Sequence, residues 1–327
     1  MRGPRAWAAA VAVGAACLVT PATVLAAPTQ AQLERGIVDI DVAEADGGAA
    51  AGTGIVVGSD GVILTNNHVV KGSTSIRVRE VSTNRRWAAE VLGYDVAGDI
   101  AVIRITKPGV RIRAARLGNS ARVRIGDRVI AVGNANGSGG RAEVSHGVVS
   151  RLNRSIDVEG ALGEVERLTG VIQTTTPLAP GESGGPLYNA AGRVVAMNAA
   201  ASFTVARGYA IPINRALAVV RQVRSGKGSA TVHIGPTAFL GVRLSPRATG
   251  GGGAVLSGVV AGSPAAGAGL RAGDTVTAVD GTRVASGAGL AGLIGRHRPG
   301  DVVTVTWTDA DGAVRSAQVT LVTGPTA

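Results

Sequence analysis

Short apolar runs, each closed by Gly, Asn, Asp or Ser, recur along the chain from Gly36 to Asn214. One example is Ile55-Val56-Val57, which is soon followed by Ser59-Asp60-Gly61. Runs of this length with this punctuation are typical of short β-strands joined by turns, whereas amphipathic helices show a longer 3.6-residue period. The pattern therefore predicts an all-β barrel architecture in this part of the chain rather than a series of βαβ units.

One amphipathic helix is predicted at 214–223, where Asn214 is placed to cap its N-terminus. The Gly- and Ser-rich stretch 225–230 follows it and is typical of a domain boundary. We therefore expect two folded domains. Their predicted bounds are 37–225 for the first domain, 226–236 for a linker and 237–325 for the second domain.

The N-terminal segment 1–27 carries the marks of export. Two arginines precede an apolar stretch, and Val24-Leu25-Ala26 offers a small-residue cleavage site. The apolar part approaches the length that spans a bilayer, but Pro21 interrupts it. We interpret 1–27 as a signal peptide, with a retained membrane anchor as the alternative, and 28–36 as an N-terminal linker. Either interpretation places the remainder in the periplasm, in the cell envelope or outside a bacterial cell.

The composition is basic and poor in aromatic residues. The net charge is +11, and only three of the 33 basic residues are lysines. We interpret this arginine bias as codon usage in a GC-rich genome, with the arginine cluster at 111–128 as a site that would favour anionic envelope surfaces or acidic partners. Aromatic residues make up 2% of the chain, which together with the export signal argues against nucleic-acid binding. The one cysteine, Cys17, lies in the export segment, so no disulfide is expected.

The segment Gly181-Glu182-Ser183-Gly184-Gly185-Pro186 carries the strongest chemical signal. A serine hydroxyl is a poor nucleophile at neutral pH, and it needs a base, a carboxylate that orients this base, and backbone donors for the oxyanion. The glycines allow a tight turn that aims the N–H groups of Gly181 and Ser183 at one point. By itself, however, a glycine-rich turn of this kind is common in loops without any chemistry.

A histidine and an aspartate occur upstream of this serine. His68 follows an apolar run and lies just beyond a predicted buried strand, and Asp99 opens the apolar strand 100–105. A buried aspartate at a strand edge is unusual without a partner. Asp95 is the alternative carboxylate, but it lies in a turn, so Asp99 is preferred. These residues predict a His68–Asp99–Ser183 triad for peptide-bond hydrolysis.

These motifs, with others in the same order, resemble the HtrA/Deg group of trypsin-like serine proteases, which carry a C-terminal PDZ domain. The further shared segments are Gly52-Thr53-Gly54-Ile55-Val56, Thr65-Asn66-Asn67-His68-Val69-Val70, Gly126-Asp127-Arg128-Val129, Val132-Gly133-Asn134 and Gly208-Tyr209-Ala210-Ile211-Pro212-Ile213-Asn214. The resemblance implies a mostly β chain with a chymotrypsin-like double β-barrel, and an endopeptidase that cleaves unfolded or exported proteins without a metal or organic cofactor. It also implies a homotrimer, although residues 28–50 contain no Phe, Tyr or Trp of the kind through which family members associate.

Two departures from the family pattern lie close to the serine. Glu182 stands where the family has Asn or Asp, and we expect its side chain to point to solvent. The stretch 175–179 replaces a family pattern that resembles Asp-Ala-Ala-Ile-Asn, so the hydrogen bonds of that Asp and Asn are expected to be missing. These departures motivate an alternative function, a chaperone or scaffold whose protease domain is catalytically silent or latent.

The S1 pocket of this fold is predicted to be lined by Leu178, Ala200, Ala201 and Ser202. These residues include no carboxylate, so Arg or Lys is not expected at the cleavage site. A small or medium aliphatic residue such as Ala or Val is predicted instead. The preference should be soft, because one misfitting methylene is worth only about 1–3 kcal/mol of discrimination.

The second domain resembles a PDZ module. Its marks are Phe239-Leu240-Gly241-Val242, 263–270, 273–281 and 299–305. The resemblance implies that an extended C-terminal peptide adds to an edge strand, with its carboxylate bound by the backbone N–H groups of Leu240, Gly241 and Val242. A helix that borders this groove is predicted at 288–294. Peptide binding there is expected to gate the protease domain.

Overall fold

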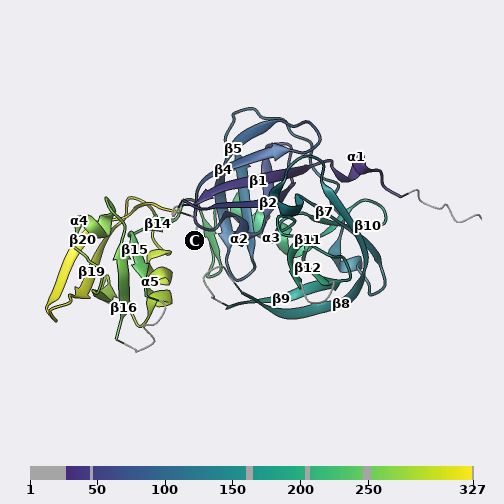
Figure 1. Ribbon diagram of the computed structural model, residues 1–327. Coiled ribbons are helices and arrows are strands. Elements are labelled where there is room, and N and C mark those ends of the chain that lie inside the picture. The colour runs from purple at the N-terminus through teal and green to yellow at the C-terminus, as the bar shows by residue number, and fades with distance from the viewer. Residues whose placement is uncertain (1–26, 45–46, 160–164, 203–206, 246–251, 326–327) are drawn as a thin grey trace, which may run out of the picture.

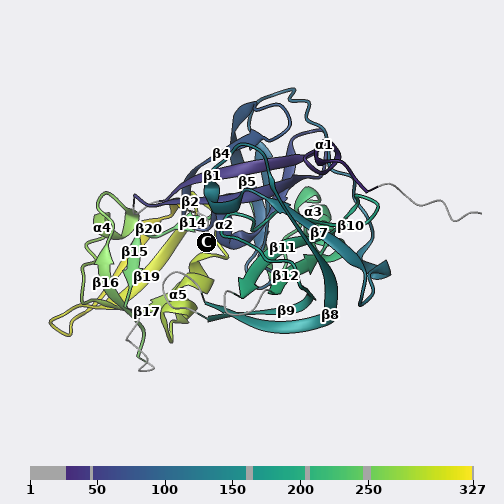
Figure 2. The same ribbon diagram turned by 45° about the vertical axis from the view of Figure 1, so that its right-hand side comes forward.

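The computed structural model describes residues 27–44, 47–159, 165–202, 207–245 and 252–325. They form two bodies, a larger one coloured purple to green and a smaller one coloured green to yellow (Figure 1). The two bodies are also seen side by side after a 45° turn (Figure 2). Strands dominate both bodies, which confirms the prediction of a mostly β chain.

The first barrel is built from antiparallel strands in the order β13-β5-β4-β1-β2-β3-β6, and a further β5–β6 pairing closes six of these strands on themselves. Alternate apolar residues of β1, namely Val38, Ile40 and Val42, belong to its core, as the two-residue period of a strand requires. The bounds are β1 Ile37–Glu44, β2 Ala49–Val56, β3 Val62–Thr65, β4 Ser73–Glu80, β5 Arg86–Asp95, β6 Ile100–Ile105 and β13 Val232–Ile234, with the one-turn helix α2 at Asn67–Val70 between β3 and β4.

The second barrel is closed, in the strand order β10-β11-β12-β9-β8-β7. Short 3-10 turns precede its first two strands, η1 at Ser120–Arg122 and η2 at Ala135–Gly137. The strand bounds are β7 Arg128–Gly133, β8 Glu143–Glu159, β9 Val165–Thr174, β10 Pro186–Asn189, β11 Val194–Ser202 and β12 Arg207–Pro212. The predicted double β-barrel is therefore observed, and one continuous apolar cluster includes residues of both barrels.

The predicted amphipathic helix exists as α3, Ile213–Arg224, and it buries Ile213, Ala216, Val219, Val220 and Val223 on one face. The prediction that Asn214 caps it was wrong. The N-cap is Pro212, and Asn214 lies inside the first turn, where its side chain accepts a hydrogen bond from the Ser120 backbone N–H. Pro212, whose ring fixes its φ, precedes the first helical residue Ile213, so the N-cap lies two positions before the predicted one.

The predicted N-terminal linker 28–36 contains the helical turn α1, Gln30–Leu33, which Thr29 caps in a capping box. The buried Tyr188 hydroxyl of β10 donates to the Leu33 carbonyl at 2.6 Å and ties this turn to the second barrel. Within the described residues no helix is long and apolar enough to span a membrane. Residues 1–26 of the segment 1–27, which is interpreted as a signal peptide or an anchor, lie outside the described residues.

The second domain is a sheet in the order β15-β16-β17-β19-β20, with β18 paired to β17 and a separate β14–β21 pair. In the part of the domain that is described, β15 is the end strand, so its outer edge has no paired strand. The predicted groove helix is present as α5. The bounds are β14 Ala238–Phe239, β15 Val242–Leu244, β16 Ala254–Val259, α4 Pro264–Gly267, β17 Thr275–Val279, β18 Thr282–Arg283, α5 Gly287–Ile294, β19 Val302–Thr308, β20 Val314–Thr320 and β21 Val322–Thr323.

Part of the predicted linker 226–236 is a strand of the first barrel. Strand β13 pairs with β5, so that His233 lies opposite Tyr94. The two rings stack with their centroids 4.9 Å apart, and the Tyr94 hydroxyl lies 3.2 Å from the Thr237 hydroxyl at the start of the second domain. The connection between the domains is therefore bound to the first barrel along part of its length.

Candidate active site

Two of the three predicted triad residues, His68 and Asp99, lie between strands of the first barrel and contact each other directly. The Nδ1 atom of His68, in α2, lies 3.0 Å from Oδ2 and 3.1 Å from Oδ1 of Asp99, in the β5–β6 turn. The His68 backbone N–H also donates to Asp99 Oδ1 at 3.0 Å. One carboxylate thus fixes both the ring and the backbone of the histidine.

The backbone of Asp99 is held in an uncommon conformation by its neighbours. Its φ is +51°, in the left-handed region, where Asp is one of the few tolerated non-glycine residues. The Asn66 side-chain amide donates to the Asp99 carbonyl at 2.9 Å, and the Asp99 N–H donates to Val96 at 3.0 Å. The alternative carboxylate, Asp95, instead accepts a hydrogen bond from the Gly98 N–H at 3.0 Å and closes the turn.

The third predicted residue, Ser183, lies in the β9–β10 loop of the second barrel. Its hydroxyl donates to the Ala199 carbonyl of β11 at 3.3 Å. Its carbonyl accepts a hydrogen bond from the Thr53 N–H of β2 at 2.8 Å, so the serine loop is bound to the first barrel. The Thr65 hydroxyl, three residues before His68, donates to the carbonyl of the same Thr53 at 2.8 Å. The serine loop and the histidine segment are therefore bound to one residue.

Hydrogen bonds at the neighbouring carbonyls fix the directions of the Gly181 and Ser183 N–H groups, the two predicted oxyanion donors. In a trans peptide the C=O and the next N–H point to opposite sides. The Pro180 carbonyl accepts from the Asn136 N–H at 2.6 Å, which directs the Gly181 N–H the other way. The Glu182 carbonyl accepts from the Gly185 N–H at 3.0 Å, which does the same for the Ser183 N–H. Among the described residues neither of these N–H groups has a hydrogen-bond acceptor.

Glycine is required at position 181. Its φ is +89°, and a Cβ there would collide with the Asn134 carbonyl of the neighbouring loop. A side chain would therefore push the loop away from 134–137 and turn its N–H groups. The glycine-rich motif has a conformational reason at this position.

The expectation that Glu182 points to solvent was wrong. The residue is only 1% exposed, and its Oε2 accepts a hydrogen bond from the Ala179 N–H at 2.6 Å. Its Cα and Cβ lie against Gly133 of β7, at 2.7 and 2.9 Å from the position that a Cβ of Gly133 would take. Burial raises the pKa of Glu182, and the negative charge of Glu143 raises it further, while the bond from Ala179 opposes both. Its other oxygen, Oε1, is buried without a hydrogen-bond partner among the described residues.

The altered stretch 175–179 makes hydrogen bonds of its own. The Thr176 hydroxyl, fully buried, lies 2.6 Å from that of Thr174, and the Thr175 hydroxyl accepts from the Val148 N–H at 3.0 Å. Threonines thus connect this stretch to β8 and β9. The sequence shows that the Asp and Asn are absent, but it does not show that hydroxyl groups hold the segment in their place.

The predicted S1 residues are only partly described. Leu178 is half-buried, and its Cδ1 lies 3.0 Å from the position that a Cβ of Gly208 would take. The side chains of Ala200, Ala201 and Ser202 lie outside the described set. The S1 assignment and the preference for a small aliphatic residue stay predictions.

In the second domain, hydrogen bonds also fix the peptide groups of the loop 240–242, which is predicted to bind a peptide carboxylate. The Leu240 carbonyl accepts from Ala265 at 2.8 Å, and the Gly241 carbonyl accepts from Val260 at 2.9 Å. The N–H groups of Gly241 and Val242 therefore face the opposite side. Gly241 has φ +88°, and a Cβ there would collide with the side chain of Ser263.

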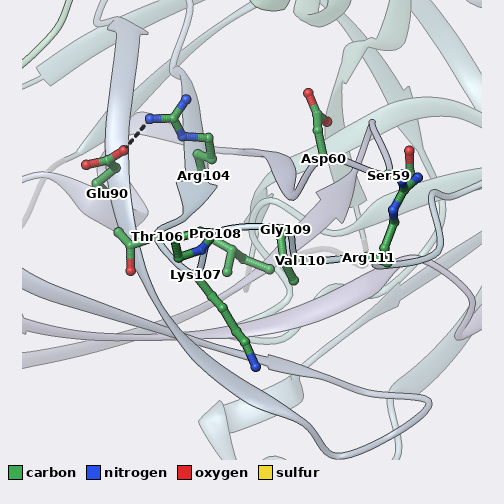
Figure 3. Close-up of a pocket in the computed structure, with 11 residues that line it drawn as sticks. Ser59, Asp60, Glu90, Arg104, Thr106, Lys107, Pro108, Gly109, Val110 and Arg111 are labelled. Atoms are coloured by element: carbon green, nitrogen blue, oxygen red, sulfur yellow. Dashed lines mark hydrogen bonds and ion pairs between the residues drawn. The ribbon is translucent and has the colours of Figure 1, made fainter.

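A separate hollow of about 620 Å³ lies on the first barrel, away from these residues (Figure 3). Its lining includes the ion pair of Arg104 with Glu90, 2.7 Å apart, together with Lys107 and Arg111. The charged side chains of Lys107 and Arg111 point in different directions in Figure 3 and do not converge on one point. Within the described residues there is no cluster of three or more His, Cys, Asp or Glu that would hold a metal ion.

Comparison with known protein families finds two matches in this chain. The model of the trypsin-like peptidase domain matches residues 52–197, and the model of the PDZ domain matches residues 238–321. The first match contains both barrel loops with His68 and Asp99 as well as the Ser183 loop. The second contains β15, α5 and the loop at 240–242.

Several curated proteins are similar along most of the chain. A protein named putative serine protease HhoA, from Synechocystis, is 33% identical over 75% of this chain and 64% of its own length. Serine protease PepD of Mycobacterium tuberculosis is 33% identical over 83% of this chain and 60% of its own length. A probable periplasmic serine endoprotease DegP-like protein of Hahella chejuensis is 34% identical over 77% and 52%. The chain thus spans between about half and two thirds of these relatives.

Solved structures agree with this similarity. The structure described as HtrA-type protease AlgW with tripeptide is 27% identical, with a TM-score of 0.52, and the alignment covers 91% of this chain and 98% of that one. A Ser-to-Ala form of the same protease with tripeptide is 26% identical with a TM-score of 0.52, over 92% and 99%. The alignments therefore include both the barrels and the smaller domain, and the fold of this chain is similar to that of solved HtrA-type proteases.

Proposed function

Because this chain belongs to the HtrA-type family of trypsin-like serine proteases with a PDZ domain, we propose that it is an exported serine endopeptidase. The observation that carries the proposal is the contact of Asp99 with both the ring and the backbone of His68. A carboxylate on Nδ1 leaves Nε2 as the atom that takes a proton, which is the arrangement that activates a serine.

In this proposal Ser183 attacks the scissile carbonyl carbon and His68 takes the hydroxyl proton at Nε2. Asp99 stabilises the imidazolium that forms, and the N–H groups of Gly181 and Ser183 donate to the oxyanion. His68 then gives its proton to the leaving amine, and the peptide bond breaks to leave an acyl group on Ser183. Water, deprotonated by His68, hydrolyses this ester and restores the serine.

Unfolded polypeptides of the envelope are the proposed substrates. The His68 side chain is 41% exposed, so an extended chain has access to it. Relatives named periplasmic serine endoproteases support a periplasmic or envelope location. Leu178, the described residue of the predicted S1 pocket, is apolar and half-buried, which supports cleavage after Ala or Val.

The second domain is proposed to bind C-terminal peptides. An extended peptide would pair with the open edge of β15 and direct its carboxylate to the N–H groups at 241–242. The solved AlgW structures contain short peptides, which supports peptide binding in this family. We propose that occupancy of this groove raises protease activity.

The first experiment is to react the protein with a fluorophosphonate, alongside a Ser183→Ala variant, and to locate the adduct by mass spectrometry. An adduct on Ser183 that is absent from the variant is expected, together with cleavage of unfolded casein. Cleavage of casein by the Ser183→Ala variant, or a failure of the natural chain to react, contradicts a serine mechanism. Failure to react, combined with suppression of casein aggregation, would favour the chaperone or scaffold instead.

A further inference from the structure

Thr53 is a fully buried residue of β2 in the first barrel, and none of the predicted catalytic roles uses it. Its hydroxyl donates to the Gly181 carbonyl at 2.7 Å and accepts from the Asn134 N–H at 2.9 Å. A threonine hydroxyl has one proton to donate, so both of these bonds are satisfied in one orientation. The side chain therefore ties together two loops of the opposite barrel.

The backbone of Thr53 makes two more connections at the same place. Its N–H donates to the Ser183 carbonyl at 2.8 Å, and its carbonyl accepts from the Thr65 hydroxyl at 2.8 Å. Thr65 ends the strand that leads to His68. Four hydrogen bonds thus converge on one residue, and they involve the oxyanion loop, the serine and the segment before the histidine.

The proposed oxyanion geometry depends on these bonds. The Gly181–Glu182 peptide is fixed at its carbonyl by Thr53 and at its N–H by the Ala179 carbonyl, 3.1 Å away. If the Thr53 bond to this carbonyl is lost, only the Ala179 bond holds the peptide, and the peptides on either side, which carry the Gly181 and Ser183 N–H groups, lose a fixed neighbour. A displacement of about 1 Å at a reacting group costs on the order of 100-fold in rate.

We infer that Thr53 is a positioning residue which, from the first barrel, holds the oxyanion loop of the second barrel in its donor orientation. The inference rests on the proposed serine protease function. Thr53 itself touches no reacting atom in this scheme. Its hydroxyl acts through Gly181, and its backbone acts through Ser183.

Thr53→Val and Thr53→Ser separate the hydroxyl from the shape of the side chain. Valine keeps the volume but removes both side-chain hydrogen bonds, while serine keeps the hydroxyl. Thr277→Val is the matched control, because the Thr277 hydroxyl also donates to a backbone carbonyl but lies in the second domain. The readout is the rate and the end point of fluorophosphonate labelling at Ser183, measured across pH.

Thr53→Val is expected to lower the labelling rate roughly 10- to 100-fold, with an unchanged end point and an unchanged pH midpoint. The midpoint should not move, because Asn66 holds Asp99, and Asp99 in turn holds His68, without any contribution from the Thr53 hydroxyl. Thr53→Ser and Thr277→Val should stay within about threefold of the natural chain, since both preserve the side-chain bonds at 181 and 134. Thr53→Val that labels at the natural rate with a reduced end point indicates partial unfolding only and overturns the inference. Thr53→Ser that is as slow as Thr53→Val also overturns it.

Amide hydrogen exchange gives a second measurement that does not depend on activity. Thr53→Val should speed exchange in peptides that cover 178–187 and leave those that cover 66–70 unchanged. If the natural chain does not react with the fluorophosphonate but this local change is seen, the protease proposal fails while the positioning role stands. Unchanged exchange in 178–187 contradicts the positioning role whatever the activity.

Discussion

Glu182 offers the sharpest test of how the serine loop is held, since its carboxyl is buried, ionisable and bonded to the turn that precedes the nucleophile. The perturbation is Glu182→Gln. Glutamine keeps an oxygen that accepts the Ala179 N–H and removes the negative charge. It differs from the natural residue in little besides its ability to ionise.

The sign of the effect follows from the raised pKa. Burial, the largest cause, and the charge of Glu143 both raise the pKa of Glu182 in the folded protein. Its folded state binds the proton more tightly than the unfolded state, where the value is 4.5. The resulting stability is fully present below the unfolded pKa and is lost as pH rises through the folded pKa. Each unit of difference is worth about 1.4 kcal/mol.

The assay is thermal unfolding of the natural chain and of Glu182→Gln between pH 4 and pH 8. The two proteins should melt at similar temperatures near pH 4, and the glutamine variant should become progressively more stable by comparison as the pH rises. Glu143→Gln is the matched control, because it removes a neighbouring exposed charge without touching the Ala179 bond. Because the charge of Glu143 raises the pKa of Glu182, Glu143→Gln should lower the pH at which the stability linked to Glu182 is lost.

A second variant, Glu182→Ala, measures how much the hydrogen bond to the Ala179 N–H contributes to stability. This change leaves the part-buried Ala179 N–H without its acceptor at 2.6 Å, which costs about 1–3 kcal/mol. It should lower kcat more than KM, since the turn supports the oxyanion donors. A stability difference between natural chain and Glu182→Gln that is constant with pH, or that shrinks as pH rises, would refute the reasoning about the buried carboxyl.

Three further predictions concern other contacts. Asp99→Asn should lower kcat by roughly four orders of magnitude through the wrong histidine tautomer, whereas Asp95→Asn should change it less than tenfold, as kinetics on casein-derived peptides will show. Gly241→Ala should abolish binding of C-terminal peptides in calorimetry, because the added methyl meets Ser263 and the φ of +88° is strained; retained binding contradicts the loop assignment. Tyr188→Phe should lower stability by about 1 kcal/mol through the lost 2.6 Å bond to the N-terminal turn, measured as a fall in Tm without loss of labelling.

Comparison of the predicted and observed elements shows which features of the fold depend on local sequence alone. The short strands and α3 follow from apolar periodicity, which is a local property, and so an all-β barrel architecture was predictable from the pattern, whereas the double barrel followed only from the family resemblance. Asn214 was predicted as a cap because Asn is a good capping residue, but the preceding Pro212 starts the helix and Asn214 bonds to a distant turn instead. Strand β13 falls inside the predicted linker, because three residues followed by Gly235 and Pro236 carry no strand signal until β5 supplies a partner.

Glu182 was misjudged for a related reason. A charged residue in a glycine-rich loop is usually solvated, and nothing near it in sequence indicates a cover. The cover comes from Gly133, about fifty positions earlier, whose lack of a side chain leaves room for the glutamate. The partner that keeps the side chain inside is a backbone N–H, which any residue at 179 would supply. Neither feature has a sequence signature.

The same limit applies to the motif around Ser183 itself. Its glycines allow the backbone conformation of the oxyanion loop but do not fix the direction of its N–H groups. A glycine at φ +89° is equally free to adopt other φ values. The orientation is selected by Thr53, whose N–H and hydroxyl bind the carbonyls on either side of Glu182. Since Thr53 belongs to the barrel that also carries His68 and Asp99, the donors and the base are aligned only when the two barrels are packed together. The proposed protease activity is therefore expected to be lost when the barrels separate, before either barrel unfolds.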